Sequence, residues 1–364
     1  MIALAWIIFS FALIQCVVAA INMLFRPSFN TLIDKDQQAL VSVLIPARNE
    51  ATHIMSLLVE LQHQQYQNLE ILVYDDASTD NTADLVSAMA WHDKRIQLFG
   101  SQRLPDGWLG KNHACFQLSK HAKGNYMLFL DADVRLDSTF IMRLIPYFNK
   151  HNLKLLSIFP RQLIGSVGEA FVVPIMNYIL LSLLPLFLVR ASKRPSLSAA
   201  NGQCMLFEAN TYRAINPHFV FRAEKVEDIR IAAYYKIQKQ KMACLGGNAY
   251  ISCRMYDSYK ASVSGFSKNI IMFFGNSKLL AILFWLITSV GFVVVLAALG
   301  MHYFLWFLVI SLLTRIFVSV AAYQSVPKNL IFLIPQQLSM GYVIWKALNA
   351  HKKGGFEWKN RKIN

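Results

Sequence analysis

The feature that most limits how this chain can fold is an uncharged apolar run over residues 3–25. A helix needs about 20 apolar residues to cross the hydrocarbon core of a bilayer, so this run is long enough to span one. No Lys or Arg precedes the run, whereas Arg26 and Lys35 follow it. Because it lacks a positive leader and a small-residue cleavage site, we expect an uncleaved anchor over residues 1–26. The positive-inside rule then predicts that the following domain is cytoplasmic, at the cell (inner) membrane.

Composition agrees with an integral membrane protein. The chain has 364 residues, is 55% hydrophobic and carries a formal net charge of +15, which is too apolar for a purely soluble enzyme. The excess of Lys and Arg suits an anionic membrane surface or a phosphorylated substrate. Because there is no zinc pattern or recognition-helix signature, we expect no nucleic acid partner, and no obligatory protein partner is evident. Five scattered cysteines fit a reduced, cytoplasmic compartment.

A soluble α/β domain is predicted over residues 39–270. Strands are expected at residues 41–45, 69–74, 96–99 and from 126, alternating with helices at 49–65, 78–91 and 114–121. Such alternation implies βαβ units and a mainly parallel, Rossmann-like sheet. Within this domain, residues 171–189 are apolar but contain two prolines, so they are interpreted as an interfacial or partly embedded helix pair.

A C-terminal membrane region is predicted over residues 279–348. Two apolar spans cover residues 279–299 and 303–323, and a third stretch, residues 330–348, is broken by Pro-Gln-Gln. With a cytoplasmic domain, three full spans would place the tail outside, yet residues 349–364 form a strongly basic tail that should stay inside. We therefore expect two full spans, with the third stretch re-entrant or interfacial.

Two carboxylates follow the predicted strand that begins at Tyr126. In Asp131-Ala132-Asp133 the acids are spaced i, i+2, so they lean to the same side where the chain leaves the sheet. Two oxygen-rich groups at a strand's carboxyl end make a site for a hard cation, and such a cation usually holds a diphosphate. Taken alone, a solvated acidic turn is the commoner outcome, so the interpretation depends on the neighbouring motifs.

Two motifs precede it at the same predicted edge of the sheet. The polar residues after the first two strands are Pro46, Arg48 and Glu50, and then Asp75 and Asp76. Ligands of doubly wound sheets bind at this edge, where an acid can accept hydrogen bonds from a base or a ribose. The alternative is that Ser78 and Thr79 only cap a helix, and the sequence leaves both interpretations open.

Two further motifs follow. Gly107 and Gly110 allow a tight turn, and Lys111 stands where a helix begins, a position that favours an anion. A solvated surface lysine is the alternative. Glu227 and Asp228 open another predicted helix, where acids usually just favour the helix dipole. A buried acid at this position could instead act as a general base.

The order of these motifs resembles glycosyltransferase family 2, with its GT-A fold, over roughly residues 39–270. Five shorter segments are similar to a membrane-bound subgroup that includes the 4,4'-diaponeurosporenoate and hopene-associated glycosyltransferases. They are residues 107–111, 201–203, 226–228, 253–256 and 265–269.

The resemblance implies a role for each motif. Pro46, Arg48 and Glu50 would border the nucleotide, and Asp75 or Asp76 would meet its base or ribose. Lys111 would approach the base or phosphates. Asp131 would handle ribose and metal, Asp133 would be the surer ligand to Mg²⁺ or Mn²⁺, and Asp228, beside Glu227, would take the acceptor's proton. Such enzymes invert the anomeric centre by a single displacement, and one base with one cation needs no enzymic nucleophile.

The chain also departs from part of the family. The Gln-x-x-Arg-Trp motif of processive members does not occur in the sequence, so we expect transfer of a single sugar. Arg254, Trp358 and Arg361 are the predicted replacements, able to contact phosphate or acceptor. Cys204 and His113 lie inside motifs but show no base–nucleophile pairing, so they are predicted to be packing or hydrogen-bonding residues.

The predicted function is metal-dependent, inverting transfer of a sugar from a nucleotide-sugar, a UDP-hexose, to a lipid-like acceptor. Apolar segments beside the catalytic motifs favour an acceptor that arrives from the bilayer, such as a terpenoid, a carotenoid or a glycerolipid. The alternative is a polyprenyl-phosphate sugar transferase or a short polysaccharide synthase. A membrane scaffold without activity is the least favoured, because every acidic motif is present.

Overall fold

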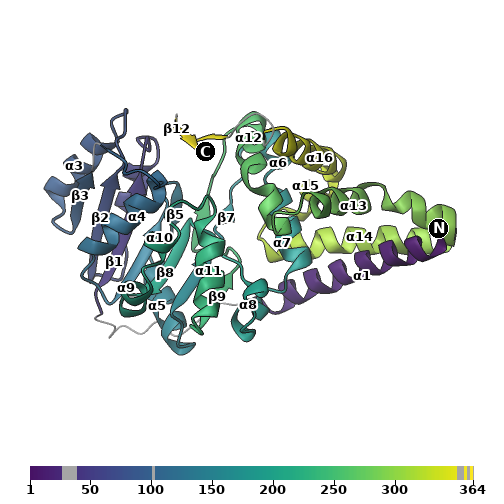
Figure 1. Ribbon diagram of the computed structural model, residues 1–364, viewed down its shortest axis with the longest axis horizontal. Coiled ribbons are helices and arrows are strands. Elements are labelled where there is room, and N and C mark those ends of the chain that lie inside the picture. Colours follow the sequence, from purple (N-terminus) through teal and green to yellow (C-terminus); the bar gives the residue numbers. More distant parts are fainter. Residues whose placement is uncertain (27–38, 101–102, 351–355, 359–360, 364) are drawn as a thin grey trace. The chain divides into compact units, whose positions relative to one another are not determined.

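The computed structural model describes residues 1–26, 39–100, 103–350, 356–358 and 361–363. The chain forms two compact units (Figure 1). The α/β unit comprises Pro27–Arg161 and Leu186–Cys253, and the helical unit comprises Met1–Arg26, Gln162–Pro185 and Arg254–Asn364. These two units are compact parts of the chain, and their boundaries differ from the domain boundaries expected from the sequence. The expected domain boundaries stay predictions.

A seven-stranded sheet of order β3-β2-β1-β4-β8-β6-β9 organises the α/β unit (Figure 1). Its strands are β1 (Val41–Ala47), β2 (Leu69–Asp75), β3 (Ile96–Gly100), β4 (Tyr126–Leu130), β6 (Leu155–Ile158), β8 (Cys204–Glu208) and β9 (Met242–Leu245). β8 runs antiparallel to β4 and β6, and the other neighbours pair in parallel. The predicted α/β fold with a mainly parallel sheet is confirmed. Mostly apolar strands such as β1 are buried on both faces, as parallel strands usually are.

Helices cover this sheet. They are α2 (Ile54–Gln62), α3 (Thr82–His92), α4 (Gly110–His121), α5 (Phe140–Lys150), α8 (Phe187–Ala191), α9 (Ala209–Ile215), α10 (Pro217–Val220), α11 (Glu227–Ile237) and the 3₁₀ turn Pro195–Leu197. A smaller antiparallel pair joins β5 (Val134–Leu136) to β10 (Ile251–Cys253), and β7 (Arg161–Gln162) lies where the chain leaves the unit. Leu57, Leu58 and Leu61 of α2 belong to the main core.

The first two helices of the α/β unit begin later than the sequence analysis predicts. The predicted starts were residues 49 and 78, whereas α2 begins at Ile54 and α3 at Thr82. Asn49 and Ala77 adopt left-handed backbone conformations, with φ of 52° and 53°. A residue in that region cannot belong to a right-handed helix, so each strand is followed by a turn rather than directly by a helix.

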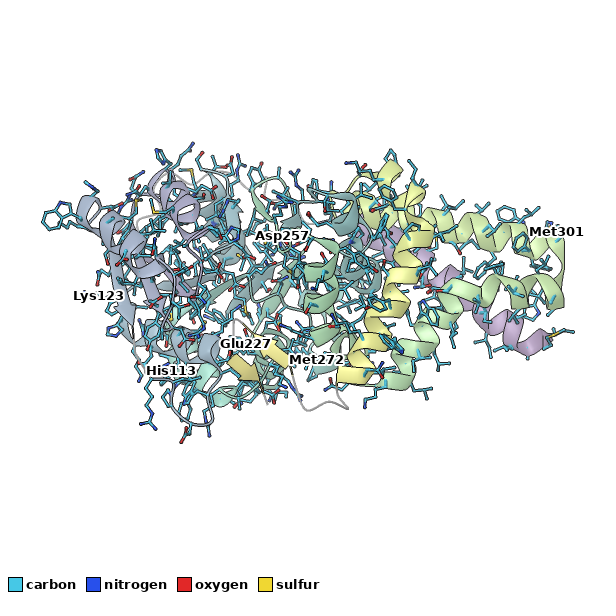
Figure 2. The ribbon with its side chains drawn as sticks, turned by 90° about the horizontal axis from the view of Figure 1, so that it is seen from above. His113, Lys123, Glu227, Asp257, Met272 and Met301 are labelled. Carbon is cyan, nitrogen blue, oxygen red and sulfur yellow. The ribbon has the colours of Figure 1, made fainter. Side chains whose placement is uncertain are left out.

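Within the described residues, the helical unit contains three helices that are long and apolar enough to cross a membrane. They are α1 (Ile2–Leu24), α13 (Lys278–Leu299) and α14 (Met301–Ala321), a finding consistent with membrane association. Figure 2 shows the turn at Met301 that joins α13 to α14. The other elements of the helical unit are α6 (Val167–Ala170), α7 (Pro174–Leu183), α12 (Tyr259–Asn269), the 3₁₀ turn Ile270–Phe274, α15 (Val326–Ile331), α16 (Leu333–Ala350), β11 (Phe356–Trp358) and β12 (Arg361–Ile363).

The third C-terminal stretch is helical on both sides of a break. The break lies at Phe332, between α15 and α16, and not at the Pro-Gln-Gln sequence that begins with Pro335. Pro335 lies in the first turn of α16, where a helix does not need its N–H. Among the described residues, α16 is not one of the helices that meet the length and hydropathy of a span. Its re-entrant or interfacial placement stays a prediction.

Candidate active site

The carboxyl ends of the central strands bring distant polar residues together. Asp131 directly follows β4, and its backbone N–H donates to the carbonyl of Gln203 at 3.1 Å. Gln203 directly precedes β8, the antiparallel neighbour of β4. The pairing of β4 with β8 therefore sets Asp131 beside the segment Asn201-Gly202-Gln203.

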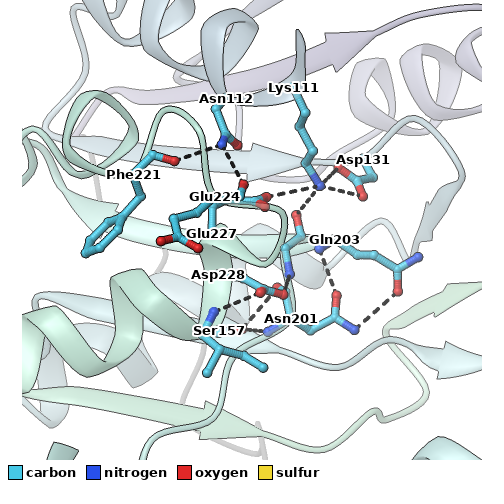
Figure 3. Close-up of polar contacts among 12 residues, drawn as sticks. Lys111, Asn112, Asp131, Ser157, Asn201, Gln203, Phe221, Glu224, Glu227 and Asp228 are labelled. Atoms are coloured by element: carbon cyan, nitrogen blue, oxygen red, sulfur yellow. Dashed lines mark hydrogen bonds and ion pairs between the residues drawn. The ribbon is translucent and has the colours of Figure 1, made fainter. Parts of the chain in front are cut away.

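Lys111, the second residue of α4, is at the centre of this arrangement (Figure 3). Its Nζ lies 2.7 Å from Asp131 Oδ1 and 3.9 Å from Glu227 Oε1, and it donates to the carbonyl of Gly202 at 3.3 Å. Burial opposes the charge, but the carboxylates of Asp131 and Glu227 raise the pKa of Lys111 well above its ordinary value. The predicted position of Lys111 at a helix start is confirmed, and the lysine is paired rather than solvated.

Glu227 and Asp228 begin α11, as predicted, and both are held inside the unit. Asp228 Oδ2 accepts the N–H of Gly202 at 2.9 Å, and Asp228 Oδ1 accepts the N–H of Ile229 at 2.8 Å. Burial raises the pKa of Asp228, although these N–H groups and Lys111 oppose the shift. Burial, opposed by Lys111 and assisted by Asp228, raises the pKa of Glu227 to about 7. A solvated pair that only favours the helix dipole would show neither shift.

Asp133 has a buried carboxylate oxygen that lacks a partner. Within the described residues, no hydrogen-bond donor meets its Oδ1. Burial and then the charge of Asp131 raise the pKa of Asp133, while a hydrogen bond from the Cys253 thiol opposes the shift. We call Lys111, Asp131, Asp133, Glu227 and Asp228 the acidic cluster.

The acidic cluster fits a divalent cation only in part. An unsatisfied carboxylate oxygen beside a second carboxylate is a suitable ligand pair for Mg²⁺ or Mn²⁺. However, the described part of the chain has no group of three or more His, Cys, Asp or Glu side chains that could hold a metal by itself. A cation here would therefore take most of its ligands from water or a bound diphosphate, as Mg²⁺ commonly does.

The turns after β1 and β2 are tied to each other. Arg48 is buried, and its guanidinium donates to the carbonyls of Asp76 and Ala77, the latter at 3.0 Å. The N–H of Asn49 donates to Ser78 Oγ at 2.9 Å. The serine therefore joins two turns, and the residue before α3, Asn81, makes no side-chain cap either. This arrangement disfavours the alternative in which the motif only caps a helix.

The remaining predicted nucleotide residues lie on the same two turns. Pro46 is paired with Tyr74 in the β1–β2 register, and the N–H of Glu50 donates to Thr82 Oγ1 at 2.8 Å. Asp75 Oδ2 accepts the N–H of Ser78 at 3.2 Å. Asp75 Oδ1 is buried and, among the described residues, has no hydrogen-bond partner. It is therefore an acceptor available to a ligand.

Three predicted contact residues lie in the other unit. Arg254 belongs to the helical unit, where its guanidinium lies 2.9 Å from the buried carboxylate of Glu169. Trp358 and Arg361 are paired in register in the β11–β12 hairpin. Their roles toward phosphate or acceptor stay predictions. Of the motif residues predicted to be structural, Cys204 is fully buried, and His113 packs edge-on against Tyr74 and Trp108.

Two groups in the site were not assigned a role from the residues alone. The backbone of Gly202 bridges Asp228 and Lys111, and a Cβ there would lie 3.2 Å from Lys111 Nζ and 3.3 Å from Glu227 Oε1. Cys253 accepts a hydrogen bond from Gln203 Nε2 at 3.0 Å. In the sequence, Gly202 stands between two residues with amide side chains, Asn201 and Gln203, directly before β8.

The fold is that of the GT-A glycosyltransferases. It aligns with a mannosyltransferase from Pyrobaculum calidifontis, PcManGT, solved in complex with GDP-Man and Mn²⁺. The alignment covers 96% of this chain and 97% of that chain, with a TM-score of 0.58 and 18% sequence identity. At that identity the likeness shows the fold alone.

Sequence comparisons show similarity to one family of enzymes. Residues 42–213 match the family described as Glycosyl transferase family 2. The chain is 28% identical over 258 residues to the 4,4'-diaponeurosporenoate glycosyltransferase of Staphylococcus aureus (strain USA300), covering 69% of this chain and 67% of that protein. It is 23% identical over 278 residues to the protein of the same name from Staphylococcus haemolyticus (strain JCSC1435), covering 73% and 71%. The chain is an enzyme of the glycosyl-transferring type, and its residues 42–213 are similar to the family 2 glycosyltransferases.

Proposed function

We propose that this enzyme transfers a single sugar, with inversion, from a nucleotide-sugar to a lipid acceptor at a membrane. The donor is a UDP-hexose, and the acceptor is a terpenoid, a carotenoid or a glycerolipid. The observation that carries the proposal is the acidic cluster, in which the first acid of α11, Glu227, lies 3.9 Å from the lysine paired with Asp131, and the second, Asp228, accepts the N–H of Gly202. The relatives named for a carotenoid acid support a lipid acceptor.

Asp228 is the proposed general base. Its two oxygens each accept one backbone N–H, so the carboxylate keeps a fixed orientation and retains lone pairs for the acceptor's proton. The raised pKa makes it a stronger base than a free aspartate. A hydroxyl acceptor needs such a base, whereas a carboxylate acceptor is already ionised at neutral pH.

The two turns after β1 and β2 form the proposed nucleotide site. Asp75 Oδ1 is a buried acceptor and suits an N–H of a nucleobase, such as that of uracil. Arg48 fixes the carbonyls of the second turn, so the acceptor is held before the ligand arrives. Lys111 supplies positive charge at the start of α4, where a phosphate group is favoured.

A divalent cation, Mg²⁺ or Mn²⁺, is the proposed cofactor, with Asp133 as its first ligand and Asp131 beside it. When bound, such a cation neutralises the charge that develops on the departing diphosphate. Asp133 is favoured because Asp131 is already paired with Lys111, whereas Asp133 Oδ1 has no partner in the described residues.

The proposed location is the inner membrane, with the α/β unit in the cytoplasm. The support is the charge bias, since Arg26 and Lys35 follow the first span and the C-terminal tail is basic. A cysteine placed at Asn364 tests this orientation, because all five native cysteines are buried and give little background. Labelling by an impermeant reagent only after the inner face is opened supports the proposal, and labelling of intact cells contradicts it.

Sugar transfer itself is tested with labelled UDP-hexose and a membrane lipid extract. We expect lipid-linked label that requires Mn²⁺ or Mg²⁺, with one sugar per lipid, and loss of the label with Asp133→Ala. Asp84→Ala is the matched control, because Asp84 is an exposed acid on α3. Transfer that survives Asp133→Ala contradicts the mechanism, and products with many sugars favour the polysaccharide synthase instead.

A further inference from the structure

A buried arginine lies inside one of the membrane-length helices. Arg315 is the one Lys, Arg, Asp or Glu of α14; α1 has none, and α13 has only Lys278 at its first position. The arginine is 6% exposed. Charged groups at such positions are unfavourable in a bilayer, and where they occur they usually mark a functional site.

The immediate partners of Arg315 are neutral. Its guanidinium lies 3.6 Å from the centroid of the Tyr178 ring, on α7, and its Nη1 donates to Gln336 Oε1 on α16 at 3.1 Å. The amide of Gln336 is itself held, because its Nε2 donates to the carbonyl of Ala170 and to Asn329 Oδ1. We call Arg315, Tyr178 and Gln336 the arginine cluster.

The arginine cluster lacks a counter-ion. Among the residues that the structure describes, no Asp or Glu forms an ion pair with Arg315, whereas Arg254 of the same unit pairs with Glu169. A guanidinium has five N–H donors in a planar fork, and Gln336 uses one of them. The tyrosine face compensates part of the charge, but it cannot accept the remaining N–H groups as an oxyanion would.

Arg315 lies close to one end of the bundle. It precedes the end of α14 by six residues, which is about 9 Å along a helix. That end adjoins Arg26, which donates to the carbonyl of Val320 and packs over the Tyr323 ring at 3.9 Å. An anionic group attached to a lipid tail reaches this depth without leaving the bilayer, whereas a free ion would have to be desolvated first.

We propose that the arginine cluster binds the anionic headgroup of the lipid acceptor. The group is a carboxylate or a phosphate, which the guanidinium fork binds through two oxygens. Tyr178 and Gln336 hold the fork in place. The inference rests on the proposed function for the statement that this lipid is the acceptor, but the binding itself does not require sugar transfer.

The probe is cis-parinaric acid, a fluorescent polyene acid, with its methyl ester as the uncharged match. The full-length protein is placed in nanodiscs of zwitterionic phosphatidylcholine, and energy transfer from tryptophan reports binding. Trp285 is a suitable source of the energy transfer, because it lies beside the arginine cluster. Its Nε1 donates a hydrogen bond to the carbonyl of Gln337, the residue next to Gln336. We expect the acid to bind about tenfold or more tightly than the ester, and Arg315→Gln to abolish that preference.

Two variants separate anion binding from packing. Arg26→Gln removes another arginine that packs on a tyrosine at the same end, and we expect it to leave the preference intact. Gln336→Glu adds a carboxylate at the position of the present acceptor. It should supply the missing counter-ion, weaken binding of the acid by about tenfold, and leave the protein folded even if Arg315→Gln does not.

Several outcomes overturn the proposal. Equal binding of acid and ester by the wild-type protein, or a preference that survives Gln336→Glu, shows that no anion site exists. Displacement of the acid by phosphatidylglycerol at equal mole fraction assigns the site to bulk phospholipid, and displacement by inorganic phosphate assigns it to a free ion. If the preference is seen but no sugar is transferred to any lipid, the binding site stands and the proposed function fails.

Discussion

The acidic cluster of the α/β unit and the arginine cluster of the helical unit carry opposite imbalances of buried charge. The first sets one lysine, Lys111, among four carboxyl groups. The second sets Arg315 among neutral partners. The arginine is buried, whereas the lysine and its partner Asp131 are partly exposed.

The difference indicates what each cluster binds. A buried charge is tolerated when it is paired, and a missing partner costs several kcal/mol in a fully buried setting. A cluster with excess acid is therefore completed by a cation, and a cluster with an isolated guanidinium is completed by an anion. A metal–diphosphate group suits the first cluster and an acidic lipid suits the second, and the proposed function requires both ligands.

The largest effect is expected from Asp133→Asn. The substitution keeps the shape but removes the negative charge that would hold the cation, so kcat should fall about a thousandfold. Because the native carboxylate is buried and partly unsatisfied, thermal stability should stay equal or rise. Initial rates and thermal unfolding on the same preparation test both. Lost activity together with lost stability would instead indicate that Asp133 is structural.

Asp228→Asn should separate acceptor chemistries. With a hydroxyl acceptor the loss of the base should slow transfer about a hundredfold or more. With a carboxylate acceptor, already ionised, the rate should change by less than about tenfold. Parallel assays with a polyene acid and the corresponding alcohol measure the ratio. Equal losses with both acceptors would rule out a role as base.

Lys111→Met tests the pairing inside the acidic cluster. It leaves Asp131 and Glu227 without their cation, so the free energy of unfolding should fall by about 3 kcal/mol, moderated by partial exposure of the pair. Denaturant unfolding of the α/β unit, followed by its own tryptophan signal, measures the loss. Lys123→Met, at an exposed position after α4, should change stability by less than about 0.5 kcal/mol.

Acid should remove the stability that a neutral His218 gives to the α/β unit. Burial, with a further contribution from Lys111, lowers the pKa of His218 to about 3, so the folded unit keeps this imidazole neutral while the unfolded chain protonates it. Stability from this group is fully present above about pH 6.5 and is lost as pH falls, by about 2 kcal/mol between pH 7 and 5.

The control for this acid effect is His218→Gln, which keeps a polar partner for Tyr212. The variant should lack this contribution, so the difference in unfolding free energy between the wild-type protein and the variant should change by about 2 kcal/mol between pH 7 and 5. The arginine and amide of the second cluster do not titrate in this range, so the helices of that unit should persist. A pH slope that is identical in the variant would exclude His218 as its source.

Much of the α/β unit could be predicted because its signals are local. Buried parallel strands are mostly apolar runs, as at Val41–Ala47, and a glycine before Lys111 marks a helix start. The acids at strand ends follow from the side-chain period of a strand. The helix starts were wrong where Asn49 and Ala77 adopt left-handed conformations, which a composition pattern does not specify.

The contacts that complete the site could not be predicted from the residues alone, because they join distant segments. Gly202 meets Lys111 across 91 positions of sequence, and only the β4–β8 pairing brings them together. The sequence shows Arg315 inside an apolar span, but the lack of a carboxylate partner depends on how α7, α14 and α16 pack. Whether a buried cluster has an excess of positive or of negative charge therefore depends on the folded structure.

Binding of UDP as a function of Mn²⁺ tests the central claim most directly. Calorimetry on the full-length protein should show that UDP binds at least about tenfold more tightly with saturating Mn²⁺ than with chelator. The same titration with Asp133→Asn should show no effect of the metal. UDP affinity that is equal with and without metal in the wild-type protein, or a metal effect that survives the substitution, would contradict the account.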